Sequence, residues 1–345
     1  MTSTIPWHSA ARVAARVAGS HPLASSYHVA VLAEQAPMMV QRAAAMVAEE
    51  TGLDGEGYPD VAVIDRREWV DRNLDFFRAI LAPAEEAIAA RLSGAGSGSA
   101  LGQRFVAAEM GALLGVLARR VLGQYELVLP SAENGDTVSL VAPNILALER
   151  QHQFRPSEFR FWLALHEVTH RLQFVGIPWM RDYFLGLVRE LVAMAKPDPG
   201  RLARLVSEIR RAGAVGEPIV GEAGLLGLFA SPEQRQLIDR VQALMSLLEG
   251  HGHVVMDRIG ARTLVTQKRM SSLLKHRRKD PRMAAFMRLT GMEMKLRQYE
   301  LGERFVKSVE RRAGWAALDA AWEGPESLPT RAEIEDPETW LGRIG

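Results

Sequence analysis

Two histidines lie four residues apart in the segment HEVTH, and an acidic residue directly follows the first of them. On an α-helix, residues i and i+4 share one face, so His166 and His170 can offer two imidazole nitrogens to one metal ion. Glu167 lies about 100° around the helix from His166, where it can reach a water bound to that ion without ligating the ion. The spacing therefore predicts a metal centre with Glu167 as general base.

The sequence around HEVTH favours a buried, well-fixed helix over residues 156–174, ended by Gly176 and Pro178. One helical stripe carries aromatic and apolar residues together with both histidines, which places the histidines toward the interior. The stripe comprises Phe159, Trp162, Leu163, His166, His170, Gln173 and Phe174. A chance match is the alternative, and its probability in a chain of this composition is on the order of one per cent.

A third ligand is needed, because a catalytic zinc ion normally has three protein ligands and one open position. The best candidate is Glu249 in LLEGHGHVVMD, at the edge of the apolar face of a helix predicted over 232–257. Burial of a carboxylate is costly without a partner. Gly250 and Gly252 leave room beside Glu249 for another helix or a substrate.

His253 and Asp257 follow Glu249 at four-residue steps and share its face, whereas His251 points roughly the other way. We predict that Glu249 is the third ligand and that His253 orients a ligand by hydrogen bonding. The alternative, with His253 as the ligand and Glu249 as its orienting carboxylate, stays open. So does a polar helix end with solvated side chains.

The composition limits the ligand types and the partners. The 345 residues contain no cysteine, which excludes disulfides, a thiolate zinc site and a cysteine nucleophile. Lys and Arg number 42 against 41 Asp and Glu, so no overall field favours nucleic acid or a membrane surface. The basic run KHRRKDPR, residues 275–282, is interpreted as a solvated helix end. We therefore expect neither a nucleic-acid nor a membrane partner.

The N-terminus lacks the features of an export signal, and charged residues interrupt every long apolar window. A cytoplasmic location without membrane spans is therefore expected. The length fits one large domain or two closely packed ones. We predict an N-terminal helical region over 1–124 and a metal-binding region over 125–345, packed together as one compact unit.

Most of the chain repeats apolar residues at helical spacing. Long helices are predicted in the first third, over 26–52, 67–92 and 103–123, with a small-residue loop at 93–100. The runs ELVLP and TVSLVAP, separated by Asn134-Gly135-Asp136, predict a small β-hairpin. Further helices are predicted over 178–196, 198–212, 261–278, 281–311 and near 315–322, followed by a turn-rich tail.

HEVTHRLQF, LLEGHGHVVMD, KLRQYELGERFVKSVE and ESLPTRAEIEDPETWLGRI together resemble the bacterial zincin-like hydrolases, a family of zinc-dependent metalloproteases. One branch of that family is associated with biosynthesis of the deazaflavin coenzyme. The resemblance covers most of the chain. It implies a mainly α (α+β) fold, with a zincin-like helical core and a small β-hairpin before the HExxH helix, and Zn²⁺ as cofactor.

Residue by residue, His166, Glu167 and His170 match the family's zinc motif, and Glu249 matches the Glu of its E-G segment. The family pattern has an acid or amide four residues after that Glu, where this chain has His253. Because of this departure, the resemblance does not assign a role to His253, and both assignments given above stay open.

These residues predict a zinc-dependent hydrolase, metallopeptidase-like, that acts on a peptide or small-molecule amide with a metal-bound water and Glu167 as base. Tyr299 is a candidate second donor to the developing oxyanion. TVSLVAPNI is a candidate edge strand for an extended substrate. The alternative function is a helical protein with a structural or vestigial zinc site, acting as a binding module.

Overall fold

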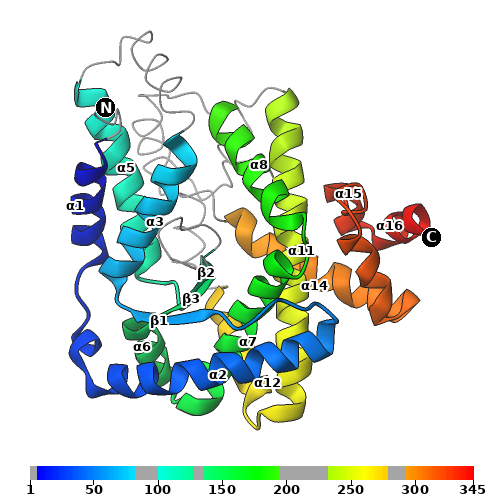
Figure 1. The fold of residues 1–345 in the computed structure, drawn as a ribbon, viewed down its shortest axis with the longest axis horizontal. Helices are drawn as coiled ribbons and strands as arrows, with labels where there is room; N and C mark the ends of the chain where they lie inside the picture. Colours follow the sequence, from blue (N-terminus) through cyan, green and yellow to red (C-terminus); the bar gives the residue numbers. More distant parts are fainter. Residues whose placement is uncertain (1–5, 83–99, 127–135, 195–231, 279–292) are drawn as a thin grey trace, which may run out of the picture. The chain divides into compact units, whose positions relative to one another are not determined.

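The computed structural model describes residues 6–82, 100–126, 136–194, 232–278 and 293–345, and the chain divides into two compact units (Figure 1). The first comprises Met1–Gly176, Ala195–Pro197 and Ile259–Gln267. The second comprises Ile177–Met194, Asp198–Arg258 and Lys268–Gly345. The boundary predicted between residues 124 and 125 stays a prediction.

A three-stranded mixed sheet lies at the centre of the first unit. Its strands are β1 (Asp60–Ile64), β2 (Gly123–Glu126) and β3 (Thr137–Val141), in the order β1-β3-β2. β3 is parallel to β1 and antiparallel to β2, and all five of its residues are buried. A strand covered on both faces reads as a continuous apolar run, which explains TVSLV.

Helices cover both faces of this sheet. On one side, α1 (Trp7–Ala18), α3 (Arg66–Leu81) and α5 (Ala100–Ala118) form a core with Ile64 and Val141. Arg72 of α3 reaches the same face, where it bonds Glu126 of β2 at 2.8 Å. On the other side, α7 (Pro156–Val175) contacts β2 and β3, and α2 (Tyr27–Thr51) contacts α7 and β1.

Two short helices complete the first unit: η1 (Pro22–Ser25) and α6 (Ala142–His152). Buried ion pairs then fix α7 to its neighbours. Arg160 makes a two-pronged contact with Glu149 of α6 at 2.7 and 2.9 Å. Arg171, the residue after His170, bonds Asp136 at 2.6 Å just before β3. Because these pairs flank the HEVTH turn on both sides, the helix that carries the motif is held along its length.

The second unit is helical throughout its described part. It comprises α8 (Met180–Met194), α11 (Pro232–Thr263, whose last turn belongs to the first unit), α12 (Gln267–Arg278), α14 (Glu293–Ala313), η3 (Trp315–Trp322), α15 (Arg331–Glu335) and α16 (Pro337–Ile344). Helices α11 and α14 cross with their backbones in contact at Gly250 and Gly302. The sequence predicted room beside Glu249 for another helix or a substrate. At Gly250 the approaching element is helix α14.

The C-terminal segment is anchored on α14. Trp340 of α16 is fully buried, packs against Phe305 with ring centroids 5.2 Å apart, and donates to the carbonyl of Ser327 at 2.9 Å. Arg343 bonds Glu333 of α15 at 2.7 Å. The tail, predicted as a loop with short helical turns, contains two short helices held by these contacts.

The predicted mainly α (α+β) class is confirmed. Helices predicted over 26–52, 156–174 and 178–196 are confirmed by α2, α7 and α8, and the one over 232–257 continues six residues further. Of the predicted hairpin, the second strand is confirmed as β3; its antiparallel partner is β2 at Gly123–Glu126, and residues 127–130 of the predicted first strand lie outside the described residues. Neither β1 nor α6 was predicted from the sequence.

Several predictions fall wholly or partly outside the described residues: most of the 93–100 loop, the 198–212 helix, the start of the 281–311 helix and the end of the basic run. Within the described ranges, no helix has the length and apolarity needed to cross a membrane.

Candidate metal centre

Helix α7 presents the HEVTH turn from a largely buried segment. Pro156 occupies its first turn, where a missing N–H costs nothing, and the helix continues to Val175. Phe159, Trp162 and Leu163 of the predicted stripe are buried, while His166 and His170 are half-buried. The stripe therefore faces inward and leaves the two imidazoles partly accessible.

The two imidazoles converge on one point. Nε2 of His166 and Nε2 of His170 lie 3.2 Å apart, with the ring planes at 81° to each other. Two nitrogens bound tetrahedrally to one Zn²⁺ at about 2.0–2.1 Å would lie ~3.3 Å apart. The pair therefore fits two ligands of one zinc ion.

The second histidine is oriented by an amide. Nδ1 of His170 lies 2.9 Å from Oε1 of Gln173, a fully buried residue one turn further along α7. Because a carboxamide oxygen can only accept, the proton lies on Nδ1 and the lone pair on Nε2. That tautomer is the one a metal ligand needs.

Glu167 is buried, 5% exposed, and lies against the first residue of β2. A Cβ at Gly123 would lie 2.7 Å from Oε1 of Glu167 and 2.8 Å from its Cδ. A side chain at residue 123 would therefore displace the Glu167 carboxylate from this position.

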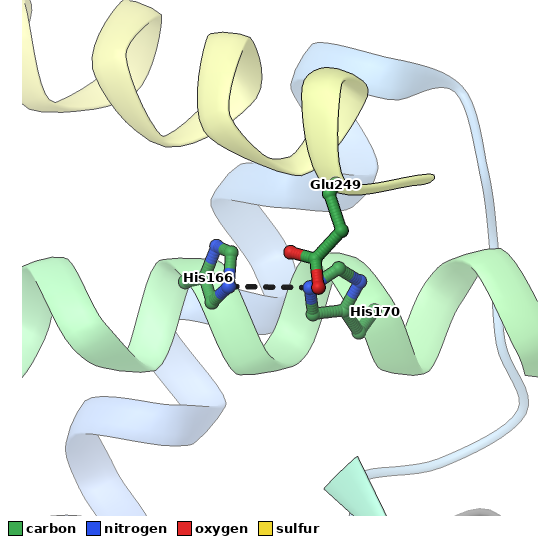
Figure 2. Close-up of side chains that lie close together, drawn as sticks. All are labelled: His166, His170 and Glu249. Carbon is green, nitrogen blue, oxygen red and sulfur yellow. Dashed lines mark hydrogen bonds between the residues drawn. The ribbon is translucent and has the colours of Figure 1, made fainter. Parts of the chain in front are cut away.

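Glu249 is buried on α11, 5% exposed. One nitrogen from each of His166 and His170 and one oxygen of Glu249 all lie within 4.8 Å of one another. Figure 2 shows the Glu249 carboxylate pointing toward the two imidazoles. Two imidazoles and one carboxylate form a donor set known from catalytic zinc sites, so the residue types fit the ion.

The other histidines of the EGHGH segment have different surroundings. Nε2 of His253 lies 3.8 Å from Asp257 and 3.6 Å from Glu303 of α14, so His253 groups with these two carboxylates. His251 is buried and packs between Trp315 and Trp322, with ring centroids 5.5 and 5.3 Å away. The sequence predicted that His251 points away from the face that carries Glu249, and its packing against the two tryptophans agrees with this prediction.

The predicted edge strand TVSLVAPNI is wrong. Its strand part, β3, has a partner on each side, and its second part begins helix α6. An apolar run cannot by itself distinguish a central strand from an edge. The strand next to Glu167 is β2, which has β3 on one side. The side chain of Tyr299, the candidate oxyanion donor, lies outside the described ones.

Two residues near the motif had no predicted role. Gln173 lies three residues after His170, a spacing that brings side chains together on a helix, so the signal was present in the sequence. Gly123 gave no such signal, because its contact with Glu167 depends on how the sheet packs on α7.

Comparison with known proteins agrees with the motif. The model of a family described as zincin-like metallopeptidases matches residues 5–341. A crystal structure from Chloroflexus aurantiacus, described as that of a candidate hydrolase with a novel fold, is similar over 99% of this chain and 98% of that chain, with 31% identity and a TM-score of 0.69. No curated protein matches. With the family model spanning nearly every residue, the chain belongs to the zincin-like metallopeptidases.

Proposed function

We propose that this protein is a zinc-dependent hydrolase of peptides or small amides. His166, His170 and Glu249 would hold the ion, and Glu167 would act as general base. The observation that carries the proposal is the convergence of two Nε2 atoms, 3.2 Å apart, with a buried carboxylate in the same 4.8 Å group. Membership of the zincin-like metallopeptidases supports the reaction class.

Glu249 is proposed as the third ligand because one oxygen of its buried carboxylate belongs to the same group of ligand atoms as the two imidazole nitrogens.

When bound, Zn²⁺ supplies a Lewis acid and lowers the pKa of a water ligand toward neutrality. Glu167 then takes a proton from the attacking water at its carboxylate and returns it to the leaving nitrogen. Burial against Gly123 holds that carboxylate in one place. Gln173 keeps the lone pair of His170 on Nε2 throughout.

Strand β2 supports a peptide substrate. In the described part of the sheet it has β3 on one side only, and it begins at the residue that touches Glu167. An extended backbone can add to such an edge by main-chain hydrogen bonds. Tyr125 of β2, whose ring stacks on Phe174 at 6.4 Å, would then border the substrate.

Paired substitutions test the proposal. Purified wild type, Glu167→Gln and His170→Ala are assayed for zinc content and for cleavage of a quenched-fluorescent peptide library and of aminoacyl anilides. Glu167→Gln should keep zinc and lose turnover roughly 10²–10⁴-fold. His170→Ala should lose the ion held by the HEVTH centre as well as turnover. Glu190→Gln and His28→Ala, both exposed, serve as matched controls.

The same assays distinguish the proposed hydrolase from the alternative function, a structural or vestigial zinc site. A wild type that binds zinc but whose measured properties are unchanged by Glu167→Gln would indicate a structural or vestigial site. A wild type that binds no zinc when the ion is supplied would contradict both functions.

A further inference from the structure

A second group of ligand-type side chains lies in the second unit, apart from the HEVTH motif. His253 and Asp257 of α11 and Glu303 of α14 each contribute one nitrogen or oxygen atom, all within 4.8 Å of one another. His253 is buried, 3% exposed, whereas Asp257 and Glu303 are half-buried. The group therefore combines a buried imidazole with two partly accessible carboxylates.

The crossing of two helices creates this group. Gly250 and Gly302 bring the backbones of α11 and α14 into contact, and Ser246 borders the same crossing. Glu303 directly follows Gly302, and His253 lies about one turn beyond Gly250. His253 and Asp257 are four residues apart on α11, so both project to the same side.

The distances suit a shared ion better than direct hydrogen bonds. Nε2 of His253 lies 3.6 Å from Oε2 of Glu303 and 3.8 Å from Oδ2 of Asp257. Hydrogen bonds between such groups measure about 2.7–3.2 Å. Two donors bound to one ion at about 2.0–2.2 Å, at angles from tetrahedral to 120°, lie ~3.3–3.8 Å apart.

The local charge also favours a cation. Two carboxylates face His253, and Lys307 offsets one of them by bonding Oε1 of Glu303 at 2.6 Å. That bond holds Glu303 with its other oxygen, Oε2, toward His253. Neutral imidazole with carboxylates is a donor set that first-row divalent transition metals accept.

We infer that His253, Asp257 and Glu303 form a second divalent transition-metal site, distinct from the HEVTH centre. The ion would tie α11 to α14 immediately after the turn that carries Glu249. The inference does not depend on the proposed hydrolase function, because these three residues take no part in the proposed chemistry.

Zinc stoichiometry tests the inference. Full-length protein is stripped with a chelator and titrated with Zn²⁺ by calorimetry, and bound zinc is counted by elemental analysis. Wild type should bind two ions. Glu303→Gln and, independently, Asp257→Asn should weaken one of them by roughly 10–100-fold or more. Glu300→Gln, an exposed acid-to-amide change on the same helix, should bind two.

Combination with His170→Ala assigns the ions. If the sites are separate, His170→Ala and Glu303→Gln each retain one ion, and the double variant retains none. The inference is overturned if Glu303→Gln and Asp257→Asn both bind as many ions as wild type, and as tightly. It is also overturned if the double variant still binds one ion. Failure of the HEVTH centre alone would appear differently, as a His170→Ala variant indistinguishable from wild type.

Discussion

At the scale of single residues, the proposed chemistry depends on groups that fix the ligands as much as on the ligands themselves. Gln173 accepts from Nδ1 of His170 at 2.9 Å and is fully buried. Gln173→Leu removes the acceptor that selects the tautomer, so Zn²⁺ affinity should fall about 10–100-fold. Competition with a chromophoric chelator measures this fall. Gln173→Glu retains an acceptor and should bind at least as tightly as wild type, and equal affinity of the Leu variant would refute the role.

Gly123 should control the base without affecting the metal. A Cβ there would lie 2.7 Å from Oε1 of Glu167, so Gly123→Ala must displace that carboxylate. We expect unchanged zinc content and a drop in peptide cleavage, on the order of 10²-fold if general-base assistance is lost. A variant with normal turnover would show that catalysis does not need the carboxylate position set by Gly123.

The sequence predicted the candidate ligands because their chemistry is local. The four-residue step of His166 and His170 and the apolar face around Glu249 can be recognised without a fold. The grouping of His253 with Glu303 could not be predicted, since the two residues are far apart in the chain and meet only where α11 crosses α14.

At the scale of elements, the crossing of α11 and α14 leaves no space for added side-chain atoms. Alanine is normally favoured over glycine within a helix by about 0.5–1 kcal/mol. At Gly302, however, a Cβ would overlap the backbone at Ser246. Gly302→Ala should therefore lower the free energy of unfolding by about 1–3 kcal/mol. Gly342→Ala on α16, where a Cβ meets no atom within 4 Å, should be neutral or stabilising in the same urea titration.

Helical periodicity predicted α2, α7, α8 and α11 because each has a long amphipathic or buried pattern. The element errors have physical causes. β1 has only five residues, and α6 begins directly after the last residue of β3, so no intervening turn residues mark where the helix starts. The central position of β3 depends on pairing with β1, which lies more than seventy residues earlier in the chain.

At the scale of the whole molecule, bound zinc should raise stability, since an ion that binds the folded chain shifts the unfolding equilibrium. At a free concentration 100 times Kd the gain is about 2.7 kcal/mol per site. Chelation should therefore lower the wild-type Tm, and His170→Ala should respond less to the chelator. Thermal scans with and without Zn²⁺ measure both, and identical responses of the two proteins would contradict a stabilising ion at His170.

Acid stability should depend on carboxylates that tie elements together. Burial alone would raise the pKa of Glu158, but hydrogen bonds from the Thr266 hydroxyl and backbone N–H, and from Arg155, outweigh it and hold the pKa below 4.5. Glu333 has the same balance, with Arg343 and Thr330 lowering its pKa despite burial. A carboxyl whose pKa is depressed by folding stabilises the protein above its unfolded pKa, and that stability is lost as pH falls through the folded pKa. Burial raises the pKa of Asp71 and Asp319. Their contribution to stability therefore increases as pH falls, opposite to that of Glu158 and Glu333.

Thr266→Val isolates the Glu158 contribution. It removes the 2.7 Å hydroxyl donor and leaves the backbone donor at 2.8 Å, so the pKa of Glu158 should move back toward its ordinary value. At pH 7 the variant should be less stable by about 1.5 kcal/mol, the usual size of a hydrogen bond to a charged group. The difference should shrink as pH falls below 4.5, because a protonated Glu158 no longer favours the donor. Urea unfolding of wild type and variant at several pH values measures this difference. A stability difference that stays constant from pH 7 to pH 3 would mean that the Thr266 hydroxyl acts through packing and not through the charge on Glu158.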